Sequence, residues 1–516
     1  MTSPSIPQET TNINDERAVR LDKLRQIEAL GIHSHPDQFE KTHTVSDILQ
    51  HGEQETVRSN EEVQANPQPA FRTAGRIIGL RRHGKMFFAD IQDETGVLQL
   101  CLFQNVVGEK IYQQLFDFLD LGDFIGVYGE LATTRQGKLA LVTTEATLLG
   151  KALRPLAGKF HGLEDTEKKY RQRYLDTLAD RESFHRFVVR SRLVQSIRTR
   201  LLGKHFTEIM TRTLQPQAGG AVAKPFLTHH NALDQDFALR ISPELDLKTA
   251  IIAGFDRVFE FATNFRNEGI DPSHLQEFQM LEWYCAYENF ERGIEWTTEI
   301  MRECIPEALG ANTFTVYDRQ GTACEIDIAA PFRRVTFGEL LAEQGVDIFA
   351  SKEELAVVAR QNGLLEEEIR TRSRGNLLDE IYKKLVRPNI IQPTFITHHP
   401  ADLLPLARQN DADPRLADSY QLLIASWEVV KGYSELVDST RQRAMLEEQS
   451  REKASGDEEA MSVNEEYLAA MEHGMPPITG CGIGIDRLAT LITGQKNLRD
   501  CVLFPLMKPD DGYESI

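Results

Sequence analysis

The alternation of apolar and polar residues is clearest between residues 256 and 290, where two apolar stretches flank a polar segment. Both stretches are rich in Phe, Val, Tyr and Trp, and the segment between them contains Gly269, Asp271 and Pro272. This pattern predicts two antiparallel strands joined by a long loop. We expect the rest of the chain to be organised around this strand pair.

Charged and aromatic side chains share faces of these two predicted strands. Because side chains alternate along a strand, Arg266 and Glu268 should point the same way near the end of the first strand. On the second strand, the shared face carries Phe278, Met280, Glu282 and Tyr284. Charges are costly to bury on such apolar strands without partners. One interpretation is therefore an internal Arg–Glu ion pair in a solvated sheet. The additional His274 in the loop favours a ligand site.

Residues 71–150 show a second pattern, in which five short apolar stretches are separated by turn residues. The stretches are FRTAGRIIGLRR, KMFFADIQD, VLQLCLF, DFIGVYGELATT and KLALVTTEATLL. They predict a five-stranded Greek-key barrel of the OB-fold type. Such barrels bind single-stranded nucleic acid through aromatic and basic side chains, here Arg81, Arg82, Lys85, Phe88 and Gln99. Phe88 fits the core of the barrel equally well.

The segments around the barrel are more polar. Residues 1–13 are expected to be disordered, and Asn14 is a good N-cap for a helix that ends near Gly31. The faces of this helix outside its narrow apolar stripe are basic, with Arg17, Arg20, Lys23 and Arg25. They are interpreted as solvated surface, with contact to nucleic-acid phosphates as the alternative. Residues 51–69 are predicted to be a linker or mobile segment.

The segments after the barrel predict mainly helices. Residues 151–185 are strongly charged and are expected to form a connector. Residues 184–202 predict a long amphipathic helix. Residues 330–400 contain several helical stretches, which we interpret as an insertion packed on the sheet.

The composition is that of a multidomain protein, with 516 residues of which 41% are hydrophobic. The net charge of −20 means that any nucleic-acid binding must rely on local basic patches. Six scattered cysteines without a CxxC pair argue against disulfides and zinc. The polar N-terminus and the lack of a membrane-spanning apolar run predict a soluble, cytoplasmic protein. Four histidines lack spaced metal-ligand partners and are not predicted to bind metal: His229, His230, His398 and His399.

Two motifs carry a family resemblance. FRNEG (265–269) followed by EFQMLEWY (277–284) resembles motif 2 of class II aminoacyl-tRNA synthetases, in the form found in lysyl-tRNA synthetases. GCGIGIDRLATLI (480–492) resembles motif 3. The similarity runs from about Val19 to the C-terminal LRDCVLFPLMKP, and the two motifs together are far more specific than either alone.

The resemblance implies an α+β fold, in which a class II antiparallel sheet flanked by helices follows an N-terminal five-stranded OB-fold β-barrel. The expected segments are a tail, basic helix and linker (1–70), the anticodon-binding barrel (71–150), a connector (151–185) and the catalytic domain (186–516). Within the last, the resemblance places motif 1 at about 186–216, motif 2 at about 256–288, a helical insertion at about 335–390 and motif 3 at about 480–509.

The resemblance also implies a lysine–tRNA ligase, which uses ATP and Mg²⁺ to join L-lysine to tRNA(Lys) and is expected to be a homodimer. The position of Arg266 implies a bridge between the lysine carboxylate and the α-phosphate, a task that suits a planar guanidinium. Arg487 would contact the γ-phosphate of a bent ATP. Further ATP-binding positions are Glu268, His274, Phe278, which would stack on adenine, and Glu428, which matches a magnesium ligand.

The lysine and anticodon positions follow from the same resemblance. Lysine recognition requires a buried negative charge, which Glu282 with Tyr284 would provide. The other matching lysine-binding positions are Gly220, Glu244 for the α-amino group, Arg266, Lys431, Tyr433 and Glu435. Gln421 and Glu435 are weaker metal candidates than Glu428. In the barrel, the anticodon would be read by Arg81, Arg82, Phe88 and Gln99.

The chain departs from the family pattern at four positions. Gln421 stands where a second metal-binding Glu is usual, Lys431 and Leu275 each replace an Asn, and Arg212 replaces the proline that packs across the dimer interface. Because the exchanges at Gln421 and Lys431 both add positive charge near the phosphates, we hypothesise that Lys431 takes over part of the role of one magnesium ion. The alternatives are that Lys431 repels the lysine ammonium, so that the substrate differs, or that it points to solvent.

Two other functions are open to a chain of this pattern. One is the adenylation of a lysine-like amino acid for transfer to a protein, but family relatives of that kind lack the barrel. The other is a non-catalytic RNA-binding relic, in which the motif arginines tend to be lost, whereas Arg266 and Arg487 are both present. Aspartyl and asparaginyl enzymes need a cationic or amide-reading pocket, where this chain has Glu282.

Overall fold

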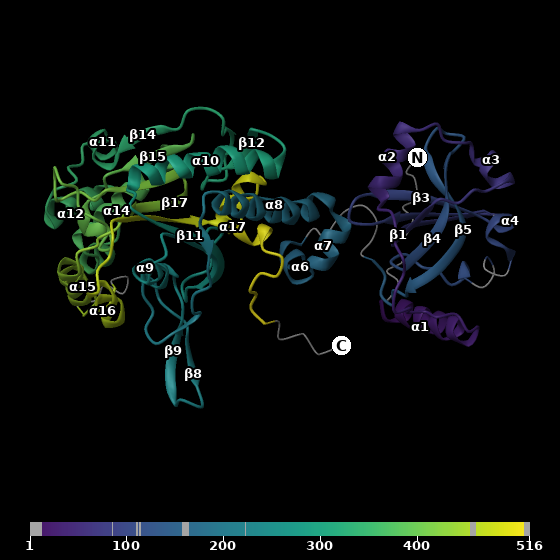
Figure 1. Cartoon of the computed structure of the whole chain (residues 1–516), viewed down its shortest axis with the longest axis horizontal. Coiled ribbons are helices and arrows are strands. Elements are labelled where there is room, and N and C mark those ends of the chain that lie inside the picture. Colours follow the sequence, from purple (N-terminus) through teal and green to yellow (C-terminus); the bar gives the residue numbers. More distant parts are fainter. Residues whose placement is uncertain are drawn as a thin grey trace, which may run out of the picture. The chain divides into compact units, whose positions relative to one another are not determined.

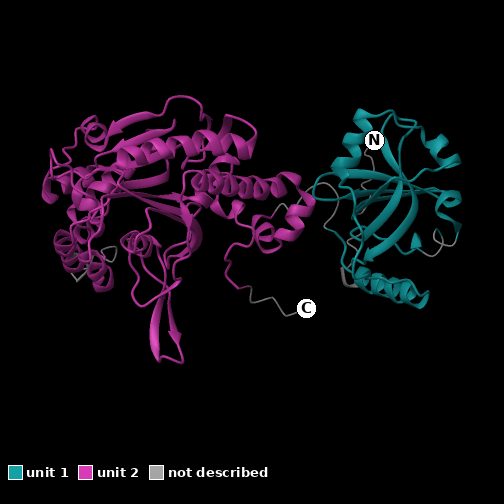
Figure 2. Cartoon of the chain, viewed as in Figure 1, with its two compact units in different colours: residues 1–164 teal, residues 165–516 magenta. Residues whose placement is uncertain are grey.

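The computed structural model describes residues 13–84, 86–109, 112, 115–156, 165–221, 223–454 and 461–509. The chain divides into two compact units, residues 1–164 and residues 165–516 (Figure 2). The expectations for residues 1–12 and for Lys85 fall outside the described part. Within that part, no helix is long and apolar enough to cross a membrane.

Unit 1 contains the predicted five-stranded barrel. Its strand order is β1–β2–β3–β5–β4, and pairing of β1 with β4 closes it. The strands are β1 (Phe71–His83), β2 (Met86–Gln92), β3 (Val97–Phe103), β4 (Phe124–Thr133) and β5 (Leu139–Gly150), with α4 (Gln104–Val107) after β3. Buried side chains alternate with partly exposed ones along β1, as the apolar alternation predicts. Ile77, Ile91 and Leu100 are fully buried in the barrel core.

Residues 51–69 are not a linker, contrary to the prediction. They hold the end of α2 (Val45–Gln54) and all of α3 (Asn60–Ala65). Ser59 and Glu62 form a capping box at the start of α3, and Val63 is fully buried against the barrel. A short helix with a single buried side chain leaves almost no periodic signal in the sequence, which explains the error.

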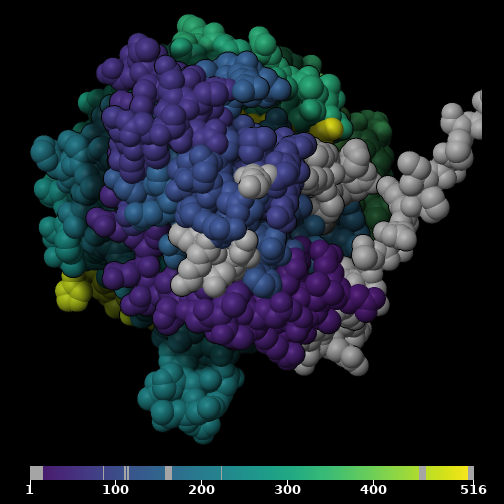
Figure 3. Space-filling view, turned by 90° about the vertical axis from the view of Figure 1, so that its right-hand side faces the viewer, coloured from purple at the N-terminus to yellow at the C-terminus, as the bar shows by residue number. Residues whose placement is uncertain are grey.

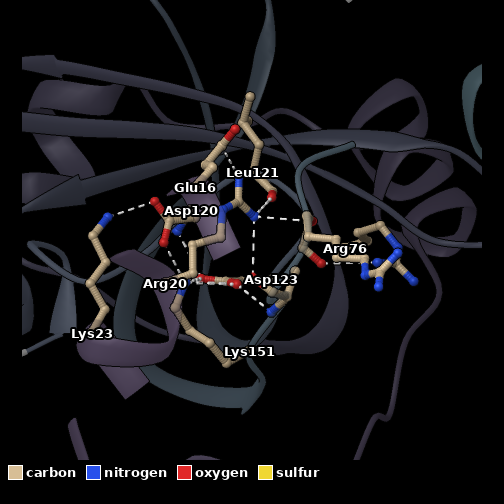
Figure 4. A network of polar contacts seen from close by, with 11 residues as sticks. Glu16, Arg20, Lys23, Arg76, Asp120, Leu121, Asp123 and Lys151 are labelled. Carbon is tan, nitrogen blue, oxygen red and sulfur yellow. Dashed lines mark hydrogen bonds and ion pairs between the residues drawn. The ribbon is translucent and has the colours of Figure 1, made fainter. Parts of the chain in front are cut away.

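The basic N-terminal helix α1 (Ile13–Ala29) is only partly a solvated surface. It lies across unit 1 as the darkest purple segment of Figure 3. Arg20 is 4% exposed, and its Nη1 donates to the carbonyl oxygens of Leu121 at 2.9 Å and Ala152 at 3.2 Å (Figure 4). Lys23 Nζ lies 2.6 Å from Oδ1 of Asp120. Arg20 and Lys23 therefore dock α1 onto the barrel, so the surface interpretation was wrong for these two.

Unit 2 is built on an eight-stranded, mainly antiparallel sheet with the order β14–β15–β16–β17–β18–β11–β10–β6. The strands are β6 (Thr207–Glu208), β10 (Arg257–Phe265), β11 (Glu277–Ala286), β14 (Arg333–Thr336), β15 (Thr394–Thr397), β16 (Ser419–Ile424), β17 (Trp427–Ser434) and β18 (Ile478–Gly484). The predicted pair, β10 and β11, is antiparallel, and β18 lies between β11 and β17 (Figure 1). The α+β sheet architecture expected from the sequence is confirmed.

Helices cover one face of this sheet (Figure 1). They are α8 (Arg181–Gly203), α10 (Phe290–Leu309) and α17 (Ile485–Ile492). Alternate β11 residues, including Leu281 and Trp283, point into this layer, and the rings of Trp283 and Trp296 lie 5.5 Å apart. The remaining β11 side chains point to the opposite face, where the candidate site lies.

The other elements of unit 2 surround the sheet. They are α6 (Thr166–Arg171), α7 (Arg173–Ala179), β7 (Leu214–Gln215), β8 (Leu227–His230), β9 (Gln235–Leu239), α9 (Glu244–Ile252), β12 (Thr313–Tyr317), β13 (Ala323–Asp327), α15 (Ser439–Ala454) and α16 (Glu465–Glu472). The region predicted as a helical insertion contains α11 (Phe337–Ala342), α12 (Lys352–Gln361), α13 (Glu366–Thr371) and α14 (Arg374–Leu385), which pack with β14–β16. The hairpin of β8 and β9 projects away from the rest of unit 2 (Figure 1). Short 3-10 turns at Arg387–Asn389, Ala401–Leu403 and Leu498–Cys501 complete it.

Candidate active site

A cavity of about 480 Å³ lies on the sheet face that α8 and α10 leave open. The structure brings to it all the residues assigned above to catalysis, ATP and lysine, whereas the metal candidate Gln421 does not line it. The assigned residues that line it are Gly220, Glu244, Arg266, Glu268, His274, Phe278, Glu282, Tyr284, Glu428, Lys431, Tyr433, Glu435 and Arg487. Residues from distant parts of the chain therefore meet at one place.

The floor of the cavity is the glycine-rich strand β18. Tyr284 of β11 and Tyr433 of β17 lie in register on either side of Gly480. A Cβ on Gly480 would come within 2.3 Å of the Tyr284 ring, so only glycine fits there. In the next row, Glu282 and Lys431 lie on either side of Gly482, roughly 10 Å apart at strand spacing. Lys431 therefore lines the cavity and is also exposed to solvent.

One end of the cavity is acidic. Glu282 is 3% exposed and accepts hydrogen bonds from the Ser242 hydroxyl at 2.9 Å and the Tyr284 hydroxyl at 3.0 Å. Burial, and then the charge of Glu244, raises the pKa of Glu282 to about 8. Tyr433 donates to Glu244 Oε1 at 2.7 Å. Gly220 has a φ of +82°, and its Cβ position lies 3.0 Å from the side chain of Glu244, which explains a glycine here.

The acidic end also contains a cation that the sequence analysis missed. Lys248 of α9 is fully buried, and its Nζ lies 2.5 Å from Oε1 of Glu244. The same ammonium forms an ion pair with Glu435. The spacing of Glu244 and Lys248, one helical turn apart, was visible in the sequence, but their contact with Glu435 depends on the fold.

The other end of the cavity is rich in cations. Arg266 follows β10, and its guanidinium lies 5.0 Å from the centre of the Phe278 ring. Its Nε has no hydrogen-bond partner within the described residues. Arg487, at the start of α17, donates to the backbone carbonyl of Glu428 at 2.6 Å. Burial lowers the pKa of Arg487 to about 10, so it is a cation at neutral pH.

Three further cations line this end and were not singled out from the sequence: Arg319, Lys383 and Arg387. Arg319 donates to the Ser273 hydroxyl at 3.1 Å, and Arg387 to the Ser426 carbonyl at 2.9 Å. These contacts fix each guanidinium at the cavity wall. Arg319 lies in a turn, and Lys383 and Arg387 lie in the helical insertion. All three are outside the recognised motifs, so no local pattern predicted their place in the site.

Glu428 is the carboxylate of the cationic end. Burial opposes its ionisation, but neighbouring cations, Lys431 first among them, lower its pKa to about 2. Gln421 does not line the cavity; it lies behind Glu428, donates to Glu428 Oε2 at 2.5 Å, and accepts from Tyr382 at 3.2 Å. Gln421 thus contacts Glu428 directly, and its weak metal-binding assignment stays a prediction. Glu435 contacts Lys248 instead of this group, which argues against a metal-binding role for Glu435.

The loop between β10 and β11 carries the remaining predicted ATP contacts. Glu268 is exposed at the cavity rim. His274 is half-exposed, and its Nδ1 lies 2.7 Å from Oδ2 of Asp271. Leu275 lines the cavity and packs against the core of unit 2. The loop has no regular structure, in agreement with its turn-rich sequence.

The adjacent histidine pairs differ in setting. His399 is buried against Phe337, and burial together with the charge of Lys431 lowers its pKa to about 4. His229 lies on the exposed hairpin and contacts Asp236 at 2.9 Å. No group of three or more His, Cys, Asp or Glu placed to hold a metal ion occurs in the described ranges.

The predicted anticodon residues all belong to β1–β3 of unit 1, but the strand register puts only Arg81, Phe88 and Gln99 on one face, whereas Arg82 points to the other. Phe88 is partly exposed, packs on a small barrel cluster, and faces His83 at 6.3 Å, so it is both a packing residue and a surface aromatic. Arg81 and Gln99 both contact Asp90, at 2.9 Å and 3.4 Å. Arg82 pairs with Asp117 at 2.7 Å. Such exposed ion pairs are weak, so phosphates can compete for both arginines.

Comparisons with known proteins agree with this arrangement. Residues 165–508 match the family described as tRNA synthetases class II (D, K and N), and residues 71–149 match the OB-fold nucleic acid binding domain. The lysine–tRNA ligase of Lactococcus lactis subsp. lactis (strain IL1403) is 40% identical over 97% of this chain and 100% of its own length. Those of Erwinia tasmaniensis and Aromatoleum aromaticum are also 40% identical, over 98% of this chain and over 98% and 99% of their lengths.

Proposed function

Because the chain belongs to the lysine–tRNA ligases of the class II tRNA synthetase family, we propose that it joins L-lysine to tRNA(Lys) with ATP. The observation that carries the proposal is the division of one cavity into an acidic and a cationic end. The acidic end suits the two ammonium groups of lysine. The cationic end suits the phosphates of ATP.

In the first step, the lysine carboxylate attacks the α-phosphate of ATP, forming lysyl-adenylate and releasing pyrophosphate. This displacement needs positioning and fixed positive charge more than covalent assistance. Arg266 lines the cavity at its cationic end, where burial lowers its pKa and the carboxylates of Glu268, Glu282 and Glu428 act in the opposite direction. It would hold the carboxylate against the phosphate, while Arg487 binds the γ-phosphate and Phe278 stacks on adenine.

Lysine specificity arises at the acidic end. Glu282 and Tyr284 receive the ε-ammonium, and Glu244 receives the α-ammonium. An amino-acid substrate with a neutral side chain would leave buried carboxylates without a cation, which costs far more free energy than a lost surface contact. Tyr433 and Glu435 complete the walls, and Gly220 lets the loop approach the substrate.

The residues at Glu428 fit a single Mg²⁺ bound mainly through ATP. Magnesium in such sites takes one or two protein carboxylates and completes its shell with phosphate oxygens and water. Glu428 would hold the ion, which would neutralise charge on the phosphates when bound. Gln421, which occupies a position where relatives of this type carry a second carboxylate, offers no charge for a second ion.

Lys431 compensates for part of that loss. Its position across Gly482 from Glu282, and its effect on the pKa of Glu428, support a role inside the cavity. We therefore retain the hypothesis that the Lys431 ammonium replaces part of the charge of one magnesium ion. Repulsion of the lysine ε-ammonium is opposed by the acidic groups that surround the substrate site.

The barrel would read the anticodon through Arg81, Arg82, Phe88 and Gln99, with bases stacked on Phe88. A homodimer and a cytoplasmic location remain predictions. Arg212, in the place of the motif 1 proline, forms ion pairs with Asp246 and Glu466 at 3.0 Å within one chain. A dimer must therefore form without the packing that proline provides.

The experiment that tests this function is amino-acid-dependent ATP–pyrophosphate exchange with lysine, ornithine, β-lysine, arginine, asparagine and aspartate. We expect exchange with lysine alone. Exchange with another amino acid of the panel would contradict the substrate and make Lys431 the specificity determinant. No exchange with any of them, in folded protein with ATP and Mg²⁺, would favour an RNA-binding relic.

A further inference from the structure

The proposed lysine site contains a lysine of the protein itself. Lys248 lies between Glu244 and Glu435, two of the three carboxylates at the acidic end, and is fully buried. We propose that Lys248 is a positioning residue that neutralises one of these three buried charges, so that the remaining two match the two ammonium groups of the substrate. The inference rests on the proposed function and names a determinant of its specificity.

The acidic end holds three buried carboxylates. Glu244, Glu282 and Glu435 are 7%, 3% and 2% exposed, and each lines the cavity. Buried carboxylates need cationic partners to remain ionised. Lysine brings two ammonium groups, and its carboxylate is assigned to Arg266. Three carboxylates would therefore face only two substrate cations, and Lys248 supplies the third.

The hydrogen bonds show which acceptors remain open to a ligand. Glu244 already accepts from Lys248 and Tyr433 through the same oxygen, Oε1. Glu435 forms an ion pair with Lys248 through Oε2, whereas its buried Oε1 has no hydrogen-bond partner in the described part of the chain. Such an oxygen is costly to bury unless a ligand satisfies it. Lys248 thus holds Glu435 through one oxygen and leaves the other open to an ammonium of the substrate.

The surroundings keep Lys248 charged. Burial opposes its ionisation, but Glu244 and Glu435 raise its pKa above the ordinary value. Its ammonium lies 5.5 Å from the centre of the Tyr433 ring and 5.8 Å from that of Tyr284. The other titratable groups that face the cluster are Glu282, Arg266 and Tyr467 of α16.

A purely structural role is the competing explanation, because Lys248 also ties α9 to the end of β17. Two variants separate charge from bridging. Lys248→Gln keeps a side chain that can donate to both carboxylates but removes the charge, and Lys248→Arg keeps the charge. The matched control is Lys151→Gln, because Lys151 is likewise buried between two carboxylates, Asp120 and Asp123, but in the barrel (Figure 4).

The experiment uses the full chain and measures calorimetric affinity for L-lysine, affinity for ATP, and thermal unfolding. Lys248→Gln should weaken lysine binding by at least about tenfold, with ATP affinity unchanged within about twofold. Lys248→Arg should retain more of the lysine affinity than Lys248→Gln. Lys151→Gln should lower the unfolding temperature without changing lysine affinity.

Infrared difference spectroscopy gives a readout that a structural role would not produce. Lysine binding to the wild type should remove the absorption of a protonated carboxyl group, because all three acids are then paired. In Lys248→Gln one protonated carboxyl should persist in the complex, since two ammonium groups face three acids. The Glu282→Gln variant identifies the wild-type band.

Several outcomes would overturn the proposal. One is that Lys248→Gln has the same lysine affinity and the same infrared difference spectrum as the wild type. Another is a parallel loss of lysine affinity, ATP affinity and thermal stability, which would make Lys248 a structural residue. If Lys248→Gln does not fold, Lys248→Met replaces it; if neither folds while Lys248→Arg does, the charge serves the fold alone. Absence of lysine binding in the wild type would instead refute the proposed function, and this inference with it.

Discussion

At the scale of single residues, the site is defined by how it separates charge. Strand β17 connects the two ends, because Glu428 lies near its start and Glu435 directly after its last residue, Ser434. Seven residues of extended chain span roughly 23 Å, enough to keep the two carboxylates in different surroundings. Cations lower the pKa of Glu428 to about 2, whereas burial raises that of Glu282 to about 8. The carboxyl groups of Glu428 and Glu282 therefore differ in protonation, which suits the first to the proposed phosphate site and the second to the proposed ammonium site.

Glu282 provides a prediction with a pH dependence. Its raised pKa means that the free enzyme carries the acid largely protonated at pH 7, while lysine binding requires the carboxylate. The affinity for lysine should therefore rise between pH 6 and 8, by up to about tenfold per unit, and level off above the pKa. The measurement is KM for lysine in pyrophosphate exchange. Glu282→Gln should raise that KM by about 100-fold or more and abolish the rise; a retained pH dependence would assign it to another group.

Lys431 provides a second prediction at this scale. Replacement by the usual residue, Lys431→Asn, removes a cation beside Glu428 and should raise the Mg²⁺ concentration needed for half-maximal adenylate formation by about threefold or more. A magnesium titration of wild type and variant measures this. An unchanged metal requirement would show that Lys431 does not substitute for a magnesium ion.

Sequence patterns predicted the residues that line the site, but not the residues from distant segments that contact them. Each residue assigned by motif to ATP or lysine lines the cavity, because strand alternation and glycine spacing fix which face those residues occupy. Lys248, Arg319 and Arg387 were missed, since their place in the site depends on contacts between distant segments. The contact of Gln421 with Glu428 was not predicted either, since a strand pattern does not show which side chain lies behind another.

At the scale of elements, period-two patterns predicted strands well and failed for short polar helices. The barrel strands and the β10–β11 pair were expected from alternation alone. The helix α3 was not, because a capping box and one buried valine are its main determinants. The docking of α1 was also missed, as basic side chains on a helix usually remain in water.

The docking of α1 can be tested through Arg20. Its guanidinium binds the carbonyl oxygens of Leu121 and Ala152, which Arg20→Ala would leave unsatisfied. The free energy of unfolding of the barrel unit should fall by roughly 2–4 kcal/mol. Denaturant unfolding and limited proteolysis of α1 measure the change, and Arg17→Ala, at an exposed position of the same helix, is the control. Equal stability of both variants would contradict this docking contact.

At the scale of the whole molecule, the proposed anticodon surface and the proposed adenylation site lie in different units. The cavity is built entirely from residues of unit 2. The predicted anticodon surface is built entirely from β1–β3 of unit 1. Changes to one function should therefore leave the other intact.

Phe88→Ala tests this separation. Loss of one stacking platform costs about 1–3 kcal/mol per base, so KM for tRNA should rise by about 5-fold to 150-fold. Lysine-dependent pyrophosphate exchange should be unchanged, since it needs no tRNA anticodon. The variant Met86→Ala, at an exposed position of the same strand, is the control. If Phe88→Ala impaired exchange as strongly as charging, Phe88 would act mainly through packing.

The most direct test of the central claim is the attachment of labelled L-lysine to a tRNA(Lys) transcript by the purified chain. We predict ATP-dependent charging that requires an intact 3′ end and is lost by at least about 1,000-fold in Arg266→Ala, because that guanidinium aligns the reacting groups. Charging with lysine would establish both steps of the reaction. Formation of lysyl-adenylate without charging, or charging with a different amino acid, would contradict a lysine–tRNA ligase.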